Sequence, residues 1–99
     1  MVKRKIIWSN RAQIKLYGIL EFYIERNKSK VYSKKLYRIL YKELKILLKH
    51  PGLGIKTDFD NVYCIIIGDY MIYYELVNEG VFVHAIRDCR QDPHDRQLK

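Results

Sequence analysis

Apolar residues recur every three to four positions through the first half of the chain, which is the period of an amphipathic helix. From residue 10 to residue 26 they fall at i, i+4, i+7, i+8 and i+11, and they are Ala12, Leu16, Ile19, Leu20 and Tyr23. Ser9 precedes this pattern, and serine is a favoured N-cap because its hydroxyl accepts a hydrogen bond from the first turn. We therefore predict a helix over residues 10–26, preceded by a short strand over residues 2–8.

A second helix is predicted from Ser29, which can cap it, to about Lys49, where the sequence HPG stops it. One side of this helix is apolar and carries Leu36, Leu40, Leu44 and Leu47. Cations gather on the other side within roughly 80° at 100° per residue, and they are Lys34, Arg38, Lys42, Lys45 and Lys49. Because only the short link RNKSK separates the two helices, we expect an antiparallel hairpin.

After HPGLGIKTDFD the period changes to that of β-strands. The remaining sequence has β-branched and aromatic runs separated by the turn signals GD and NEG, which predict antiparallel strands over residues 62–67, 70–77 and 81–87. The fold class is therefore α+β with the order β-α-α-β-β-β, in which a helical hairpin packs on one face of a small antiparallel sheet. With 99 residues, the chain is predicted to be a single domain, 1–99.

The charge of the chain favours acidic or polyanionic partners. Lysine and arginine number 19 against 11 acidic residues, so that the formal net charge is +8. The cations of the second helix could bind the phosphates of a nucleic acid or an acidic protein, or they could simply form the solvated side of an amphipathic helix. Composition alone leaves both interpretations open.

Neither a metal nor another cofactor is expected. Cys64 and Cys89 are far apart, and together with His84 and His94 they match no zinc spacing. The opening MVKRKIIWSN has an apolar run of only three residues, and no segment approaches the roughly 20 apolar residues of a membrane span. We therefore expect a cytoplasmic protein with no membrane partner.

The last part of the chain, IRDCRQDPHDRQ, is rich in side chains that could take part in catalysis. Cleavage of RNA without a metal needs a base or an acid near the reacting oxygens, and cations that stabilise the pentacovalent phosphate. Lys56, Arg87, Arg90 and His94 are the residues that could supply these groups. The signal is weak because any basic surface offers such side chains.

The order of these elements, with HPGLGIKTDF after the second helix, then GDYMIYYEL and finally VHAIRDCRQDP, resembles the RelE/ParE superfamily of bacterial toxins from type II toxin–antitoxin systems. The resemblance covers essentially the whole chain. It is greatest to the ParE branch, in the P-x-x-G turn of residues 51–54, the strand of residues 68–74 and the closing RDCRQD. RelE-type ribonucleases usually place an arginine directly after the tyrosine of the middle strand, where this chain has Met71, which lacks the charge-assisted donor.

The resemblance to ParE implies a toxin that poisons DNA gyrase without catalysing a reaction. It also implies a cognate antitoxin, typically acidic, that wraps the helices and the sheet. The contacts with target or antitoxin would come from the cations of the second helix and from Arg87, Arg90 and Arg96. The alternatives are a RelE-like endonuclease that cleaves mRNA on the ribosome with Lys56, Arg87, Arg90 and His94 around the phosphate, and a degenerate member that binds its antitoxin but poisons nothing.

Overall fold

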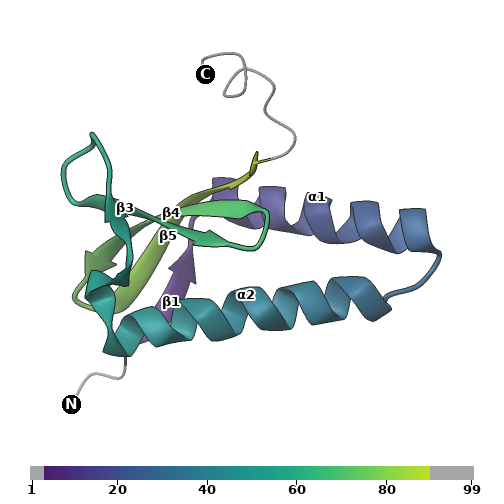
Figure 1. The fold of residues 1–99 in the computed structure, drawn as a ribbon, viewed down its shortest axis with the longest axis horizontal. Helices are drawn as coiled ribbons and strands as arrows, with labels where there is room; N and C mark the ends of the chain where they lie inside the picture. Colours follow the sequence, from purple (N-terminus) through teal and green to yellow (C-terminus); the bar gives the residue numbers. More distant parts are fainter. Residues whose placement is uncertain (1–3, 90–99) are drawn as a thin grey trace.

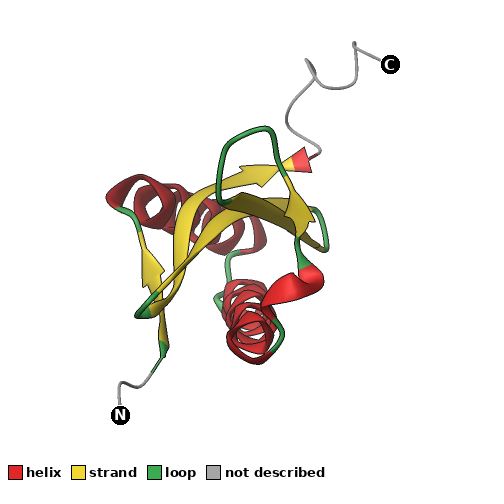
Figure 2. Cartoon of the chain, turned by 90° about the vertical axis from the view of Figure 1, so that its left-hand side faces the viewer, coloured by secondary structure: helices red, strands yellow, loops and turns green. Residues whose placement is uncertain are grey.

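A helical hairpin packs against a five-stranded sheet in the computed structural model, which describes residues 4–89 (Figures 1 and 2). The elements in chain order are β1 (Lys5–Trp8), α1 (Asn10–Asn27), α2 (Val31–Lys49), a one-turn 3-10 helix η1 (Pro51–Leu53), β2 (Ile55–Lys56), β3 (Val62–Ile67), β4 (Tyr70–Val77) and β5 (Gly80–Asp88). The α+β class and the predicted order of the helices and main strands are confirmed. Neither helix of the described residues combines the length and the apolar character that a membrane span requires.

The sheet has the strand order β1-β5-β4-β3-β2, and it is mixed rather than wholly antiparallel. β1 pairs in parallel with β5, with Lys5 opposite Gly80 and Trp8 opposite Val83. The other pairs are antiparallel, and for β3 with β4 and β4 with β5 the turn signals GD and NEG predicted this direction. The sequence did not reveal the direction of β1, because this strand is joined to the sheet through the helical hairpin and not through a short turn. It also did not reveal β2, whose two residues are too few to show a period.

The core lies between the helices and one face of the sheet, and it is continuous. Paired residues in neighbouring strands share a face, and successive residues of one strand point to opposite faces. The members of this cluster with almost no exposed surface are Ala12 and Leu16 from α1, Leu40, Leu44 and Leu47 from α2, and Tyr70, Ile72, Tyr74, Val81 and Val83 from β4 and β5. Burying such a set is the main favourable contribution to folding, so the apolar stripes read from the sequence define the core.

Two serines fix the helices locally. The Ser9 hydroxyl accepts a hydrogen bond from the Ala12 amide at 3.0 Å and donates one to the His84 carbonyl at 2.9 Å. It therefore caps α1, as predicted, and ties that helix to β5. Ser29 also accepts a bond, from the Val31 amide at 3.2 Å, although the N-cap position of α2 is Lys30.

The turn of residues 51–54 is held by a tyrosine of the core. The Tyr74 hydroxyl donates a long hydrogen bond to the Pro51 carbonyl at 3.4 Å. A Cβ atom on Gly54 would overlap that hydroxyl, although the φ angle of Gly54 is an ordinary −78°. The glycine of the P-x-x-G turn is therefore required by close packing and not by an unusual backbone conformation.

Candidate functional site

A groove of about 630 Å³ runs between the two helices. We call it the hairpin groove; it is lined by Tyr17, Leu20 and Ile24 from α1 and by Lys30, Ser33, Lys34, Tyr37 and Arg38 from α2. Tyr17 and Tyr37 expose 52% and 43% of their surface. The lining residues flank the apolar stripes that fill the core, and Lys34 and Arg38 stand where this groove meets the outer side of α2.

Ser33 allows the helices to approach at the base of this groove. Its hydroxyl is buried and donates a hydrogen bond to the Leu20 carbonyl at 2.6 Å. The cations Lys30, Lys34 and Arg38 stand at the α2 side, and within the described part of the chain no ion pair involves them. An apolar groove with unpaired cations along one side fits an amphipathic segment that carries acidic residues.

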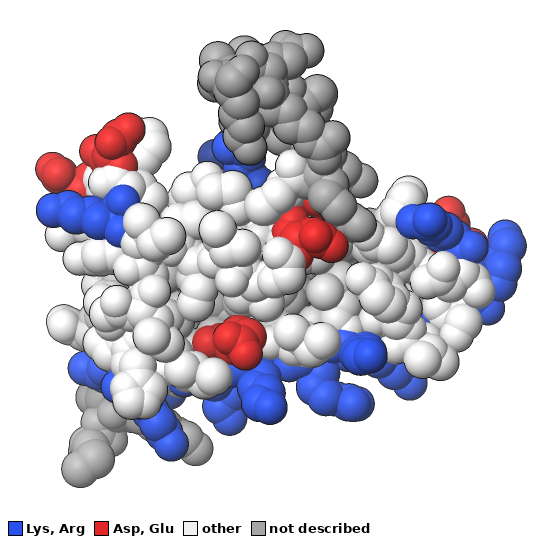
Figure 3. All heavy atoms as spheres, viewed as in Figure 1, with Lys and Arg blue, Asp and Glu red and all other residues white. Residues whose placement is uncertain are grey.

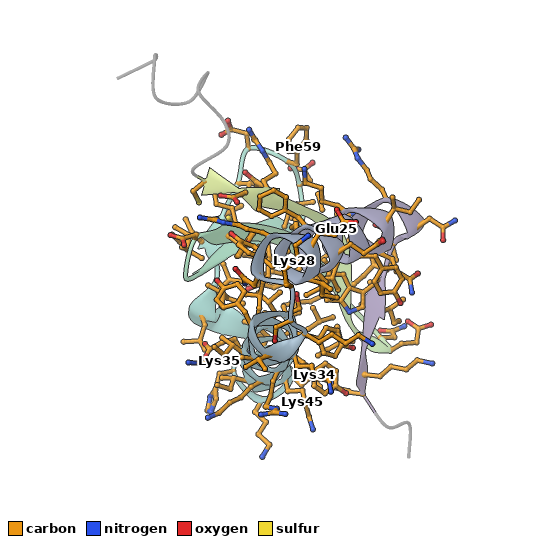
Figure 4. All side chains as sticks on the ribbon, turned by 90° about the vertical axis from the view of Figure 1, so that its right-hand side faces the viewer. Glu25, Lys28, Lys34, Lys35, Lys45 and Phe59 are labelled. Carbon is orange, nitrogen blue, oxygen red and sulfur yellow. The ribbon has the colours of Figure 1, made fainter. Side chains whose placement is uncertain are left out.

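A continuous row of cations follows the outer side of α2. We call this row the basic face; it consists of Lys34, Lys35, Arg38, Lys42, Lys45 and Lys49, all exposed. In Figure 3 blue atoms line the lower edge of the molecule, below α2, and in Figure 4 Lys34, Lys35 and Lys45 project from the outer side of that helix. The helical period placed five of these six residues on one side of the helix. Their role in binding stays a prediction.

A second basic site lies where α1 begins and β5 ends. The exposed Arg87 lines a hollow of about 430 Å³ with Arg11, Ile14, Lys15, Ala85 and Ile86. Sequence reasoning singled out Arg87 but missed Arg11 and Lys15, which α1 brings beside β5. The spacing of four residues between those two cations was visible in the sequence, but the packing of α1 on β5 was not.

The structure does not bring together the described members of the set proposed for RNA cleavage. Lys56 is in register with Tyr63, which pairs with Tyr74, whereas Arg87 pairs with Met71. Tyr74 and Met71 are an odd number of residues apart in β4, so Lys56 and Arg87 belong to opposite faces of the sheet. They also lie three strands apart, roughly 14 Å at the usual strand spacing. The other candidates, Arg90, His94 and Arg96, lie outside the described residues.

A buried polar cluster occupies the end of β4 next to α1. Tyr70 is 2% exposed, and Tyr23 and Asp88 are its polar neighbours. The Tyr70 hydroxyl makes no hydrogen bond of regular geometry within residues 4–89. Burial is the main cause that raises the pKa of Tyr70, followed by the interaction with Tyr23. The folded protein therefore holds this proton more tightly than the unfolded chain does.

Replacing Tyr70 with phenylalanine is expected to make the protein more resistant to alkaline unfolding. A raised pKa in the folded protein stabilises it fully at pH values below the pKa of tyrosine in the unfolded chain, which is near 10. This stabilisation is lost as the pH rises towards the pKa of Tyr70 in the folded protein. Above pH 10, Tyr70 should account for a slope of up to about 1.4 kcal/mol per pH unit in the free energy of unfolding. Urea titrations across this range would measure the slope, with Tyr37→Phe, at an exposed position, as the control. An unchanged slope in Tyr70→Phe would contradict the assignment.

Neither cysteine is bonded in the structure. Burial first, and then the neighbouring Cys89, raises the pKa of the Cys64 thiol, which makes Cys64 a poor nucleophile at neutral pH. Within residues 4–89, no three histidine, cysteine or acidic side chains are grouped so that they could hold a metal ion.

Comparison with known proteins gives a consistent result. Residues 6–93 match the family described as the ParE toxin of the type II toxin-antitoxin system, parDE. A solved structure described as the chromosomal ParDE TA system from P. aeruginosa is similar, with a TM-score of 0.70 and 13% sequence identity over 86% of this chain and 95% of that chain. At this identity the structural likeness shows the fold alone. No curated protein matches the chain.

Proposed function

This chain belongs to the ParE toxin family of type II toxin–antitoxin systems, and from that premise we propose that it inhibits DNA gyrase and so blocks replication. The observation that carries the proposal is the residue at position 71. In β4 the half-buried thioether of Met71 stands opposite Arg87, where a RelE-like nuclease would need a second guanidinium for the scissile phosphate. The separation of Lys56 from Arg87 also disfavours a phosphate-cleaving cluster, so inhibition by binding is favoured over RNA cleavage.

We assign the contact with gyrase to the hollow formed by Arg11, Lys15 and Arg87. Three cations from two elements face one concave surface there, and Ile14, which is 71% exposed, supplies apolar contact beside them. Such a combination of charged and apolar groups is typical of a protein-binding surface. Arg90 and Arg96, which follow β5 in the sequence, are proposed to extend the same contact.

We assign the antitoxin to the hairpin groove. A family member requires a cognate antitoxin, and the net charge of +8 favours an acidic one. The apolar side of an antitoxin helix or strand would fill the space between Tyr17 and Tyr37, and its acidic residues would meet Lys30, Lys34 and Arg38. Because gyrase and the antitoxin are both cytoplasmic partners, the toxin is proposed to act in the cytoplasm.

The test is to induce the protein in a bacterium without antitoxin and to follow labelled thymidine and labelled methionine in parallel. Thymidine incorporation should fall first, and purified protein should inhibit DNA supercoiling by gyrase. Arg87→Ala should weaken this inhibition at least tenfold, because an arginine at a binding surface is often a major contributor to affinity. Lys56→Ala, which removes a cation on the other sheet face, should not.

Two results would overturn the proposal. If methionine incorporation falls first and Lys56→Ala abolishes toxicity, the RelE-like endonuclease becomes the function. If neither label is affected while the antitoxin still binds, the chain is a degenerate member that has lost its target.

A further inference from the structure

Two tyrosines near the middle of α2 form an aromatic pair at the surface. The rings of Tyr37 and Tyr41 are nearly parallel, at 11°, with their centroids 6.3 Å apart. They expose 43% and 44% of their surface. The Lys45 ammonium lies 5.5 Å from the centre of the Tyr41 ring. Aromatic rings therefore alternate with cations on this exposed side of α2. An amphipathic helix requires only polar residues on its exposed side, so amphipathicity does not explain the rings.

Two shallow hollows meet at Tyr41. The larger, about 470 Å³, is lined by Arg38, Tyr41, Lys42, Lys45, Ile46 and Lys49. The smaller, about 260 Å³, lies towards β1 and is lined by Arg4, Lys5, Ile6, Tyr41, Lys45 and Leu48. We call the two together the Tyr41 surface. None of the residues that line it is acidic, and no ion pair within residues 4–89 involves its six cations.

The chemistry of this surface differs from that of the hairpin groove. The hairpin groove has an aliphatic wall of Leu20 and Ile24 that suits the apolar anchors of a peptide. On the Tyr41 surface, cations are the most numerous lining residues, and the most exposed apolar side chain is a flat ring. Unpaired cations beside an exposed ring are what single-stranded nucleic acid needs, since its phosphates neutralise the cations and its bases stack on the ring.

We propose that the Tyr41 surface binds single-stranded nucleic acid without base specificity, an activity separate from gyrase inhibition. From Arg38 to Lys49 the helix rises about 16 Å, which is the length of about five stacked nucleotides if their spacing is the 3.4 Å of one strand in duplex DNA. Arg38, Lys42 and Lys49 meet phosphates along this length. A base stacks on the Tyr41 ring, and Arg4 and Lys5 extend the track across β1.

The test is the fluorescence anisotropy of a labelled oligothymidine of about twelve nucleotides, titrated with the full chain at several salt concentrations. The logarithm of the binding constant should fall with the logarithm of the salt concentration, with a slope of about −3 to −4 for five phosphates. The double variant Lys42→Gln, Lys45→Gln should reduce the size of this slope by about 1.4. The matched control Arg11→Gln, Lys15→Gln, which removes the same charge from α1, should leave the slope unchanged.

A second pair of variants tests stacking separately from charge. Tyr41→Ala should weaken binding roughly tenfold, because stacking on an aromatic ring contributes substantially per base. Tyr17→Ala removes an equally exposed ring from the hairpin groove and should have no effect. Both sites are on the surface, so thermal melting should confirm that each variant is folded.

Several results would overturn the proposal. A slope near zero would exclude phosphate binding, and an equal loss in the control pair would show that net charge alone acts. If Tyr41→Ala binds normally and polyglutamate displaces the oligonucleotide as well as unlabelled oligothymidine does, the surface serves an acidic protein instead.

Discussion

Gly80→Ala is expected to lower the free energy of unfolding by about 3 kcal/mol or more. Gly80 is the first residue of β5 and has a φ angle of +139°, a backbone conformation that residues other than glycine rarely adopt. A Cβ atom there would overlap the backbone carbonyl oxygen of Lys5, its partner in β1. The obstacle is main chain and not a flexible side chain, so relief requires β1 to move away from β5.

Moving β1 would disturb the core as well as the sheet. The Lys5 amide donates a hydrogen bond to the Glu79 carbonyl at 2.8 Å, and Ile6 and Trp8 of the same strand pack against the core. The loss would be measured by urea denaturation monitored by circular dichroism.

The matched control is Gly18→Ala in α1, where a Cβ atom would meet nothing within 4 Å. Since alanine favours a helix more than glycine does, this variant should gain roughly 0.5–1 kcal/mol. Equal stabilities of the two variants would show that β1 does not approach Gly80 as closely as the structure places it.

The second large effect concerns the hairpin groove: Tyr17→Asp should weaken binding of the cognate antitoxin by about 30-fold or more. The change removes an aromatic wall and places a negative charge where an acidic partner is expected. Because Tyr17 is half exposed and its hydroxyl accepts a hydrogen bond only from the side-chain Nε2 of Gln13 among the described residues, the fold should survive. Isothermal titration with the antitoxin would measure the affinity, and coexpression would show whether growth inhibition returns.

Ile39→Asp is the control for this measurement. Ile39 is similarly exposed and lies on α2, but it does not line the hairpin groove. The Ile39→Asp variant introduces the same charge as Tyr17→Asp. Its affinity for the antitoxin should stay within about threefold of that of the unchanged protein, as expected for a position outside an interface. If both variants lose affinity equally, the antitoxin does not use the groove as its anchor.

The fold could be predicted largely because its signals are local. The N-cap at Ser9, the stop at HPG and the glycine turns of the meander each act within a few residues, and the predicted bounds of the helices and the last three strands lie close to those observed. The parallel pairing of β1 and the bulge between Tyr73 and Tyr74 depend on contacts between distant segments. No local pattern encodes them.

The same distinction applies to the site. Five of the six cations of the basic face, all except Lys35, could be found because one helix presents them at its own period. The hollow around Arg87 and the hairpin groove are each built by two elements. The roles of Arg11, Tyr17 and Leu20 therefore could not be predicted without knowing how those elements pack together. The grouping of Lys56 with Arg87 followed from residue type alone, and strand order separates them.

The pairing of β1 with β5 also has a consequence for the timing of synthesis. Lys5 emerges from the ribosome 75 residues before its partner Gly80, an interval of roughly 4 to 15 seconds at usual elongation rates. Until then β1 has no strand beside it and is not joined to the rest of the sheet. A nascent chain that ends before β5 therefore lacks both the closed core and the Arg87 hollow. The proposed inhibitory activity therefore requires translation to proceed through β5, and a cognate antitoxin would have this interval in which to meet the toxin as it is completed.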